Sequence, residues 1–147
     1  SVHIALFPQR ADLEALADPS LLERWEKLTK LRQDVLAVIE PLRKDKKIGS
    51  SLQAKVILSG RAESLAELQP YERLLPMLFI VSEVELRNEP LRPGGVTVHG
   101  AYAINIERAS GVKCERCWRY VKSVSSEPAW AGLCDRCQDA LAEPIHG

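Results

Sequence analysis

Residues 113–120, KCERCWRY, carry one CxxC motif, and residues 134–137, CDRC, repeat it with sixteen residues between the two motifs. These motifs hold all four cysteines of the chain. A CxxC motif places two thiolates on one tight turn, and two such turns supply four soft ligands for a closed tetrahedral zinc site. Two disulfides or four unrelated thiols are the alternatives. The spacing favours one structural Zn²⁺, with these candidate ligands: Cys114, Cys117, Cys134 and Cys137.

The overall composition does not indicate a charged partner, because 20 Lys and Arg residues balance 20 Asp and Glu residues. With 147 residues, 46% of them apolar, the chain can form one medium domain or two small ones. No apolar run approaches the roughly 18 residues of a membrane span, so we expect no membrane partner. Four thiols at zinc spacing favour a reducing, cytoplasmic compartment. Since the chain starts at Ser1 and its single methionine is Met77, we expect a piece of a longer protein.

Residues 1–49 are expected to be the end of a helical bundle. Asp18 is a good N-cap, and Pro19 suits the first helical position. Apolar residues then recur at three- and four-residue steps, as on one face of a helix: Leu21, Trp25, Leu28, Leu31, Val35, Val38 or Ile39, and Leu42. Pro41 should kink this helix or divide it after Ile39. We expect the apolar stripe to pack on helices upstream, and a self-associating coiled coil is the alternative.

The first helical region ends in a basic run, with Gly49 as the expected stop. Such a run is usually a solvated helix end that complements the helix dipole. Contact with phosphates is the functional alternative, and the candidate residues are Lys44, Lys46 and Lys47.

Residues 50–110 change to a mixed pattern that predicts a small α/β module with a sheet of three or four strands. Alternating or apolar runs predict four strands, at residues 52–58, 78–86, 96–99 and 101–108. Helical segments are expected at residues 62–69 and 71–75. With the helical N-terminal segment and a zinc-ribbon-like C-terminal module, the predicted fold class is α+β.

Residues 111–147 form the expected zinc module, which is too small to fold without its metal. The segment around its first CxxC motif is basic, because it contains four cations and one anion, Glu115. The cations are Lys113, Arg116, Arg119 and Lys122. Cations interleaved with Trp118 and Tyr120 suit single-stranded nucleic acid, because cations contact phosphates and rings stack on unpaired bases. The alternative for Trp118 and Trp130 is a lid packed over the thiolates, and we expect at least one of them to have this role.

The motif KCERCWRY at residues 113–120, followed by LCDRC at residues 133–137, resembles the C-terminal zinc module of bacterial isoleucyl-tRNA synthetases. Formamidopyrimidine-DNA glycosylases share this general zinc-finger type. Three upstream segments also resemble the synthetase family, in the family's order: residues 1–8, 48–54 and 80–84. Pro41 departs from the pattern, since the family more often has a helix former there.

The resemblance implies the C-terminal part of a class I isoleucine–tRNA ligase that contains no catalytic motifs and docks the anticodon stem-loop of tRNA(Ile). The expected RNA contacts are Arg116, Trp118 and Arg119, with Lys44, Lys46 and Lys47 as secondary phosphate contacts. The expected partners are this tRNA and the rest of the synthetase, with the chain itself monomeric. The alternatives are a glycosylase-type DNA-binding module and a structural docking module without RNA contact.

Overall fold

In this computed structural model, the structure describes residues 4, 6–14, 16–89 and 97–142. The chain divides into two compact units, Ser1–Leu31 and Arg32–Gly147. The first unit contains helix α1 (Arg10–Glu14) and the first half of helix α2 (Pro19–Lys44). The boundaries expected at residues 49/50 and 110/111 stay predictions. Within the described ranges, no helix is both long enough and apolar enough to cross a bilayer.

Helix α2 begins where the capping residues predict. Asp18 Oδ1 accepts hydrogen bonds from the backbone N–H groups of Ser20 and Leu21, at 2.9 and 3.1 Å. Together with the Ser20 hydroxyl, these bonds lower the pKa of Asp18. Capping bonds of this kind satisfy N–H groups that have no partner inside the helix. The N-cap expected at Asp18 is therefore confirmed.

The expected division of the helix after Ile39 is wrong, because α2 continues through Pro41 to Lys44. Pro41 lies in the last turn, so the helix loses only the bond that would join residue 41 to the carbonyl of Ala37, and Ala37 is exposed to water. The helix then stops earlier than Gly49. Lys46 adopts a left-handed φ of 57°, and Lys47 N donates to Leu42 O at 2.9 Å, which is a Schellman-type end.

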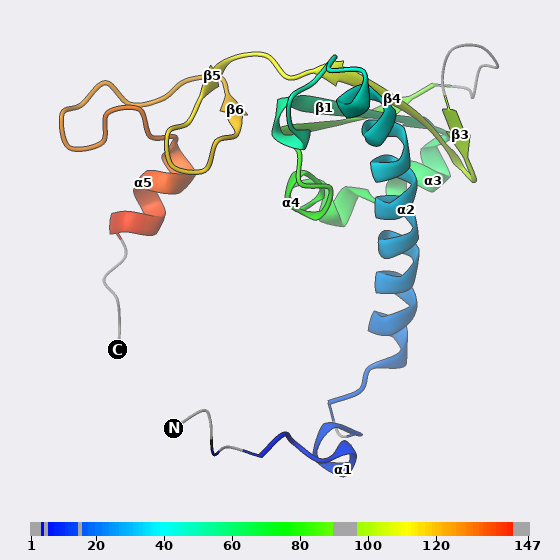
Figure 1. The fold of residues 1–147 in the computed structure, drawn as a ribbon. Helices are drawn as coiled ribbons and strands as arrows, with labels where there is room; N and C mark the ends of the chain where they lie inside the picture. Colours follow the sequence, from blue (N-terminus) through cyan, green and yellow to red (C-terminus); the bar gives the residue numbers. More distant parts are fainter. Residues whose placement is uncertain (1–3, 5, 15, 90–96, 143–147) are drawn as a thin grey trace. The chain divides into compact units, whose positions relative to one another are not determined.

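The second unit is built on a mixed four-stranded sheet with the order β2-β1-β4-β3 (Figure 1). Its strands are β1 (Ala54–Gly60), β2 (Glu83–Asn88), β3 (Thr97–His99) and β4 (Tyr102–Arg108). Strand β1 pairs with β2 in parallel and with β4 antiparallel, and β3 pairs antiparallel with β4. The α+β class and the predicted strand number are confirmed among the described residues.

The two faces of the sheet differ in polarity, because alternate residues of a strand point to opposite sides. One face is apolar and buried, with Val56 and Leu58 at 0% exposure and Ile104 at 1%. The opposite face carries a charged row. Lys55 Nζ lies 3.1 Å from Glu83 Oε1 and 2.6 Å from Glu85 Oε2, and Arg87 Nε lies 2.5 Å from Glu85 Oε1.

The connection between the parallel strands is helical, whereas a strand was expected from residue 78. A 3₁₀ turn, η1 (Ser51–Gln53), precedes β1, and α3 (Ala62–Ala66), η2 (Gln69–Tyr71) and α4 (Leu75–Leu78) follow it. Leu75 and Phe79 are both fully buried at a four-residue helical spacing, and Pro76 lies in the first turn, where proline is tolerated. The apolar run therefore begins as a helix, and β2 starts only at Glu83.

Candidate metal centre

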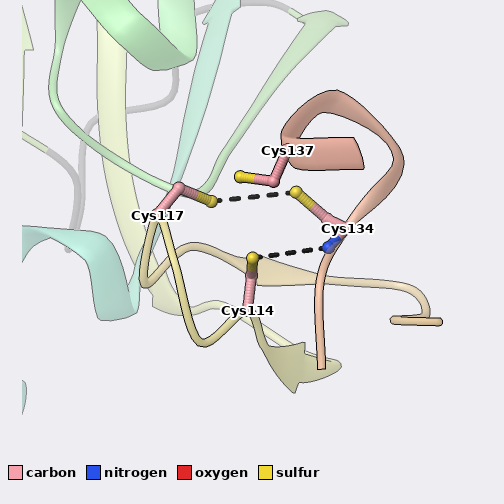
Figure 2. Close-up of side chains that lie close together, drawn as sticks. All are labelled: Cys114, Cys117, Cys134 and Cys137. Atoms are coloured by element: carbon pink, nitrogen blue, oxygen red, sulfur yellow. Dashed lines mark hydrogen bonds between the residues drawn. The ribbon is translucent and has the colours of Figure 1, made fainter. Parts of the chain in front are cut away.

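The four cysteines meet in one buried cluster, although two sequence-distant segments carry them. Cys114 and Cys117 lie in the turn between the short strands β5 (Val112–Lys113) and β6 (Tyr120–Val121). Cys134 directly precedes helix α5 (Asp135–Ala142), and Cys137 lies in its first turn. All four Sγ atoms lie within 4.8 Å of one another (Figure 2).

The sulfur geometry fits a tetrahedral zinc site. Zn–S bonds of about 2.3 Å place neighbouring sulfurs of a regular tetrahedron about 3.8 Å apart. The Sγ atoms of Cys117 and Cys134 are 3.8 Å apart, and a dashed line joins them in Figure 2. All four cysteines are free thiols, so the alternative of two disulfides is not seen. Four soft donors that fill a tetrahedron leave no open coordination position, so the donor set fits a structural Zn²⁺.

The thiols differ in how readily they ionise in the absence of metal. Burial opposes ionisation of Cys114, but bonds from the backbone N–H groups of Cys117, Cys134 and Arg116 outweigh it and lower the pKa of Cys114 to about 6. Burial raises the pKa of Cys134 to about 12 and also raises that of Cys117. A bound divalent cation reverses this tendency, because it deprotonates a coordinating thiol.

The two motifs are held together by backbone bonds as well as by sulfur geometry. Glu115 N donates to Gly132 O at 3.0 Å, and Cys134 N donates to Cys114 Sγ at 3.4 Å. Gly111 has a φ of 102°, and a Cβ there would lie 2.1 Å from Val121 O. Only glycine therefore allows the β5–β6 hairpin to close below the first motif.

The apolar cover of the thiols comes from Val121, Val124 and Leu133. Trp118 does not form the expected lid, because 60% of it is exposed. Trp118 adopts a left-handed φ of 62°, and its backbone N–H donates to Cys114 O at 2.9 Å. Lys113 Nζ lies 5.6 Å from the centroid of the Trp118 ring, within the usual range of a cation–π contact.

The two arginines expected at an RNA surface have intramolecular partners. Arg116 is exposed, and its Nη1 donates to Cys137 Sγ at 3.8 Å. Arg119 is half-buried and donates through Nη2 to Ser82 O at 2.7 Å. The Nε atom of Arg119 is buried without a hydrogen-bond partner among the described residues.

The three lysines expected as phosphate contacts lie at the end of α2 rather than in the zinc module. Lys44 is the last residue of the helix, and Lys46 and Lys47 follow it; all three are exposed. Lys47 Nζ lies 4.0 Å from Asp45 Oδ2, a weak surface pair. Their role as RNA contacts stays a prediction.

Ser82 is an important residue that the sequence analysis missed. It is 5% exposed, and its hydroxyl donates to Leu52 O at 2.5 Å and accepts from Tyr120 N at 2.7 Å. With the Arg119 bond to its carbonyl, Ser82 joins the zinc module to the sheet. A single serine after the apolar residues 78–81 was the available signal, since a buried hydroxyl needs partners.

Comparison with known proteins also assigns the four-cysteine segment to a zinc-finger family. Residues 111–140 match the family described as a zinc finger found in FPG and IleRS. The chain is 42% identical to the isoleucine–tRNA ligase of Kosmotoga olearia over 131 residues, covering 87% of this chain and 14% of that protein. It is 38% identical to the enzyme of Staphylococcus epidermidis over 142 residues, covering 96% of this chain and 15% of that protein.

The chain is homologous to the C-terminal region of isoleucine–tRNA ligases. The enzyme of Geobacter sulfurreducens shows the same relation, with 38% identity over 96% of this chain. The chain spans about 15% of the length of these relatives. The four-cysteine cluster lies inside the matched zinc-finger segment, and together they indicate one structural Zn²⁺.

Proposed function

We propose that this chain is a non-catalytic, cytoplasmic part of an isoleucine–tRNA ligase that docks the anticodon stem-loop of tRNA(Ile). In this proposal the four cysteines bind one zinc ion, and the metal fixes the first CxxC turn and its flanking side chains. The metal supplies folding free energy and no catalysis, because thiolates occupy all four of its positions.

The observation that carries the proposal is the exposed ring of Trp118. A left-handed backbone conformation is unfavourable for a bulky residue, and such strain concentrates at functional sites. The Lys113 ammonium approaches one face of the ring, while 60% of the residue stays in solvent. An exposed ring beside cations can stack on an unpaired base while the cations contact its phosphates.

The experiment replaces Trp118 with glycine in the zinc-loaded synthetase that contains this chain. Glycine accepts the left-handed φ, so we expect unchanged zinc content and thermal stability. Base stacking contributes about 1–3 kcal/mol, so the Kd for a tRNA(Ile) transcript should rise about fivefold or more. Trp118→Phe should restore most of the affinity. A Trp118→Gly enzyme that binds this tRNA as tightly as its parent would contradict the proposal.

A structural docking role without RNA contact is the second candidate, and the bonds of Arg119 and Tyr120 to Ser82 favour it. Salt dependence separates the two roles. Phosphate contacts release counterions, so tRNA binding through this chain should weaken steeply with salt, and Lys113→Ala should reduce the slope. A glycosylase-type role predicts instead that duplex DNA competes as well as tRNA does.

A further inference from the structure

An open cleft lies where the zinc module meets the sheet module of the second unit. Its apolar part comes from Leu52, from Pro76 and Met77 of α4, and from Ile80 and Val81 of the α4–β2 connection. Arg119 and Arg136 complete its charged side. The cleft has a volume of about 320 Å³, close to the lower end of the range for sites that take small ligands.

Ile80 is held in an unfavourable backbone conformation at this cleft. Its φ is 57°, and left-handed conformations are rare for β-branched residues. The residue is 51% exposed, and Met77 is 61% exposed. This conformation belongs to a Schellman-type end of α4, because Val81 N donates to Pro76 O at 2.9 Å. The helix end leaves an exposed apolar side chain at the cleft.

The charged side chains of the cleft are two arginines, and the lining also includes Cys117, whose sulfur belongs to the four-cysteine cluster. Arg119 is fixed by its bond to Ser82 O, whereas Arg136 is exposed and forms no ion pair among the described residues. No carboxylate belongs to the lining that the structure describes. A ligand that matches this cleft has a flat or apolar part and an anionic part, which are the two parts of a nucleotide.

We propose that the cleft takes one unstacked nucleotide of the RNA loop, with its base against Met77 and Ile80 and its phosphate at Arg136. The inference rests on the proposed RNA-binding function and adds a site that is distinct from the exposed ring of Trp118. A protein segment is the other conceivable occupant, but an apolar peptide would leave the guanidinium of Arg136 without an anionic partner.

The test uses filter binding of a labelled tRNA(Ile) transcript to the zinc-loaded synthetase that carries this chain. Ile80→Gly removes the side chain and relieves the left-handed strain. We expect the thermal midpoint to stay level or rise while the Kd increases about fivefold or more. A residue with a purely structural role would not combine these two effects. Arg136→Ala should lower the slope of log K against log salt by about 1.

A matched pair of variants controls for added charge. Ile80→Glu places a carboxylate in the cleft, and Leu74→Glu places one at a residue that is similarly exposed, at 47%, but does not line the cleft. We expect the first to weaken tRNA binding at least tenfold more than the second, since the carboxylate repels the phosphate.

Three results overturn the assignment of the cleft. If Trp118→Gly weakens tRNA binding and the cleft variants do not, the RNA-binding function stands and the cleft site is wrong. If neither set changes tRNA binding, both proposals fail. If Ile80→Glu lowers the thermal midpoint of the synthetase and leaves the Kd for tRNA unchanged, a segment of the synthetase occupies the cleft instead.

Discussion

Arg119 Nη2 donates to the carbonyl oxygen of Ser82 at 2.7 Å, and the next residue, Tyr120, donates its N–H to the hydroxyl of the same serine. Ser82, a residue of the sheet module, thus accepts hydrogen bonds from two consecutive residues that follow the first CxxC motif. Because Arg119 lies only two positions after Cys117, the geometry of the metal centre determines where these donors point.

Replacing Ser82 with alanine should destabilise the second unit. The change removes a buried hydroxyl and leaves Leu52 O and Tyr120 N without their partner. Unsatisfied buried groups cost about 1–3 kcal/mol, so the free energy of unfolding in urea should fall by about that amount. Ser123→Ala is the control, because Ser123 is exposed and should change stability by less than about 0.5 kcal/mol. Equal effects from the two variants would show that Ser82 does not join the modules.

Zinc should be present at one ion per chain, and its removal should unfold the zinc module before the sheet. Hydrogen exchange after chelation should lose protection first at the amides of Glu115 and Trp118, which bond to Gly132 O and Cys114 O. The amides of β1 should keep their protection from exchange. Cys134→Ser should reduce the zinc content measured by elemental analysis. Folded, metal-free protein with protected Glu115 and Trp118 amides would refute the zinc assignment.

Gly111→Ala should disrupt the β5–β6 hairpin. The new Cβ would meet the backbone oxygen of Val121 at 2.1 Å, and neither backbone can move freely. We expect a loss of at least about 2 kcal/mol in stability and weaker zinc binding, measured by competition with a chelator. Gly49→Ala is the matched control, since its Cβ would meet Gln53 Oε1 at an ordinary 3.5 Å. A tolerated Gly111→Ala would mean that the hairpin does not close as described.

Glu85→Gln should reduce stability at neutral pH and have no effect in strong acid. The bonds from Arg87 and Lys55 lower the pKa of Glu85 from 4.5 to about 2. A lowered carboxyl pKa stabilises the fold above pH 4.5, and this contribution is lost as the pH falls toward 2. Because the side chain is 34% exposed, solvent screening limits the effect to about 1 kcal/mol. Urea titrations of both proteins at several pH values measure the difference in their free energies of unfolding. A difference that does not change with pH would contradict this prediction.

The metal centre was predictable because each pair of its ligands lies close together in the sequence. Each CxxC turn brings two thiols together, and the sequence shows directly that the chain offers two such turns. The start of α2 was predictable for the same reason, since Asp18 caps N–H groups two and three residues away. The continuation of α2 through Pro41 was not predictable. The free-energy cost of a proline in a helix depends on how close the helix end lies, and on whether the carbonyl that loses its hydrogen bond is in contact with water.

The cleft and its surroundings could not be predicted from local patterns. Ile80 stands in an apolar run that strand and helix periodicities fit equally well, and its left-handed φ belongs to the end of α4, where Val81 N donates to Pro76 O at 2.9 Å. The intramolecular bonds of Arg119 likewise depend on a partner 37 residues away. The side chains that surround the metal follow from the sequence, and the structure shows which of them already have intramolecular partners.

The contacts of Ser82 have a consequence for the order of folding. Its partners Leu52, Arg119 and Tyr120 are 30, 37 and 38 residues distant in sequence, whereas the thiols of each CxxC motif are neighbours. Contacts of large sequence separation require closure of a long loop, which slows their formation. We therefore expect the metal-bound turns to form early and the docking on Ser82 to be a slow, late phase in refolding. In the newly synthesised protein, the cleft would then be the last feature of this unit to be completed.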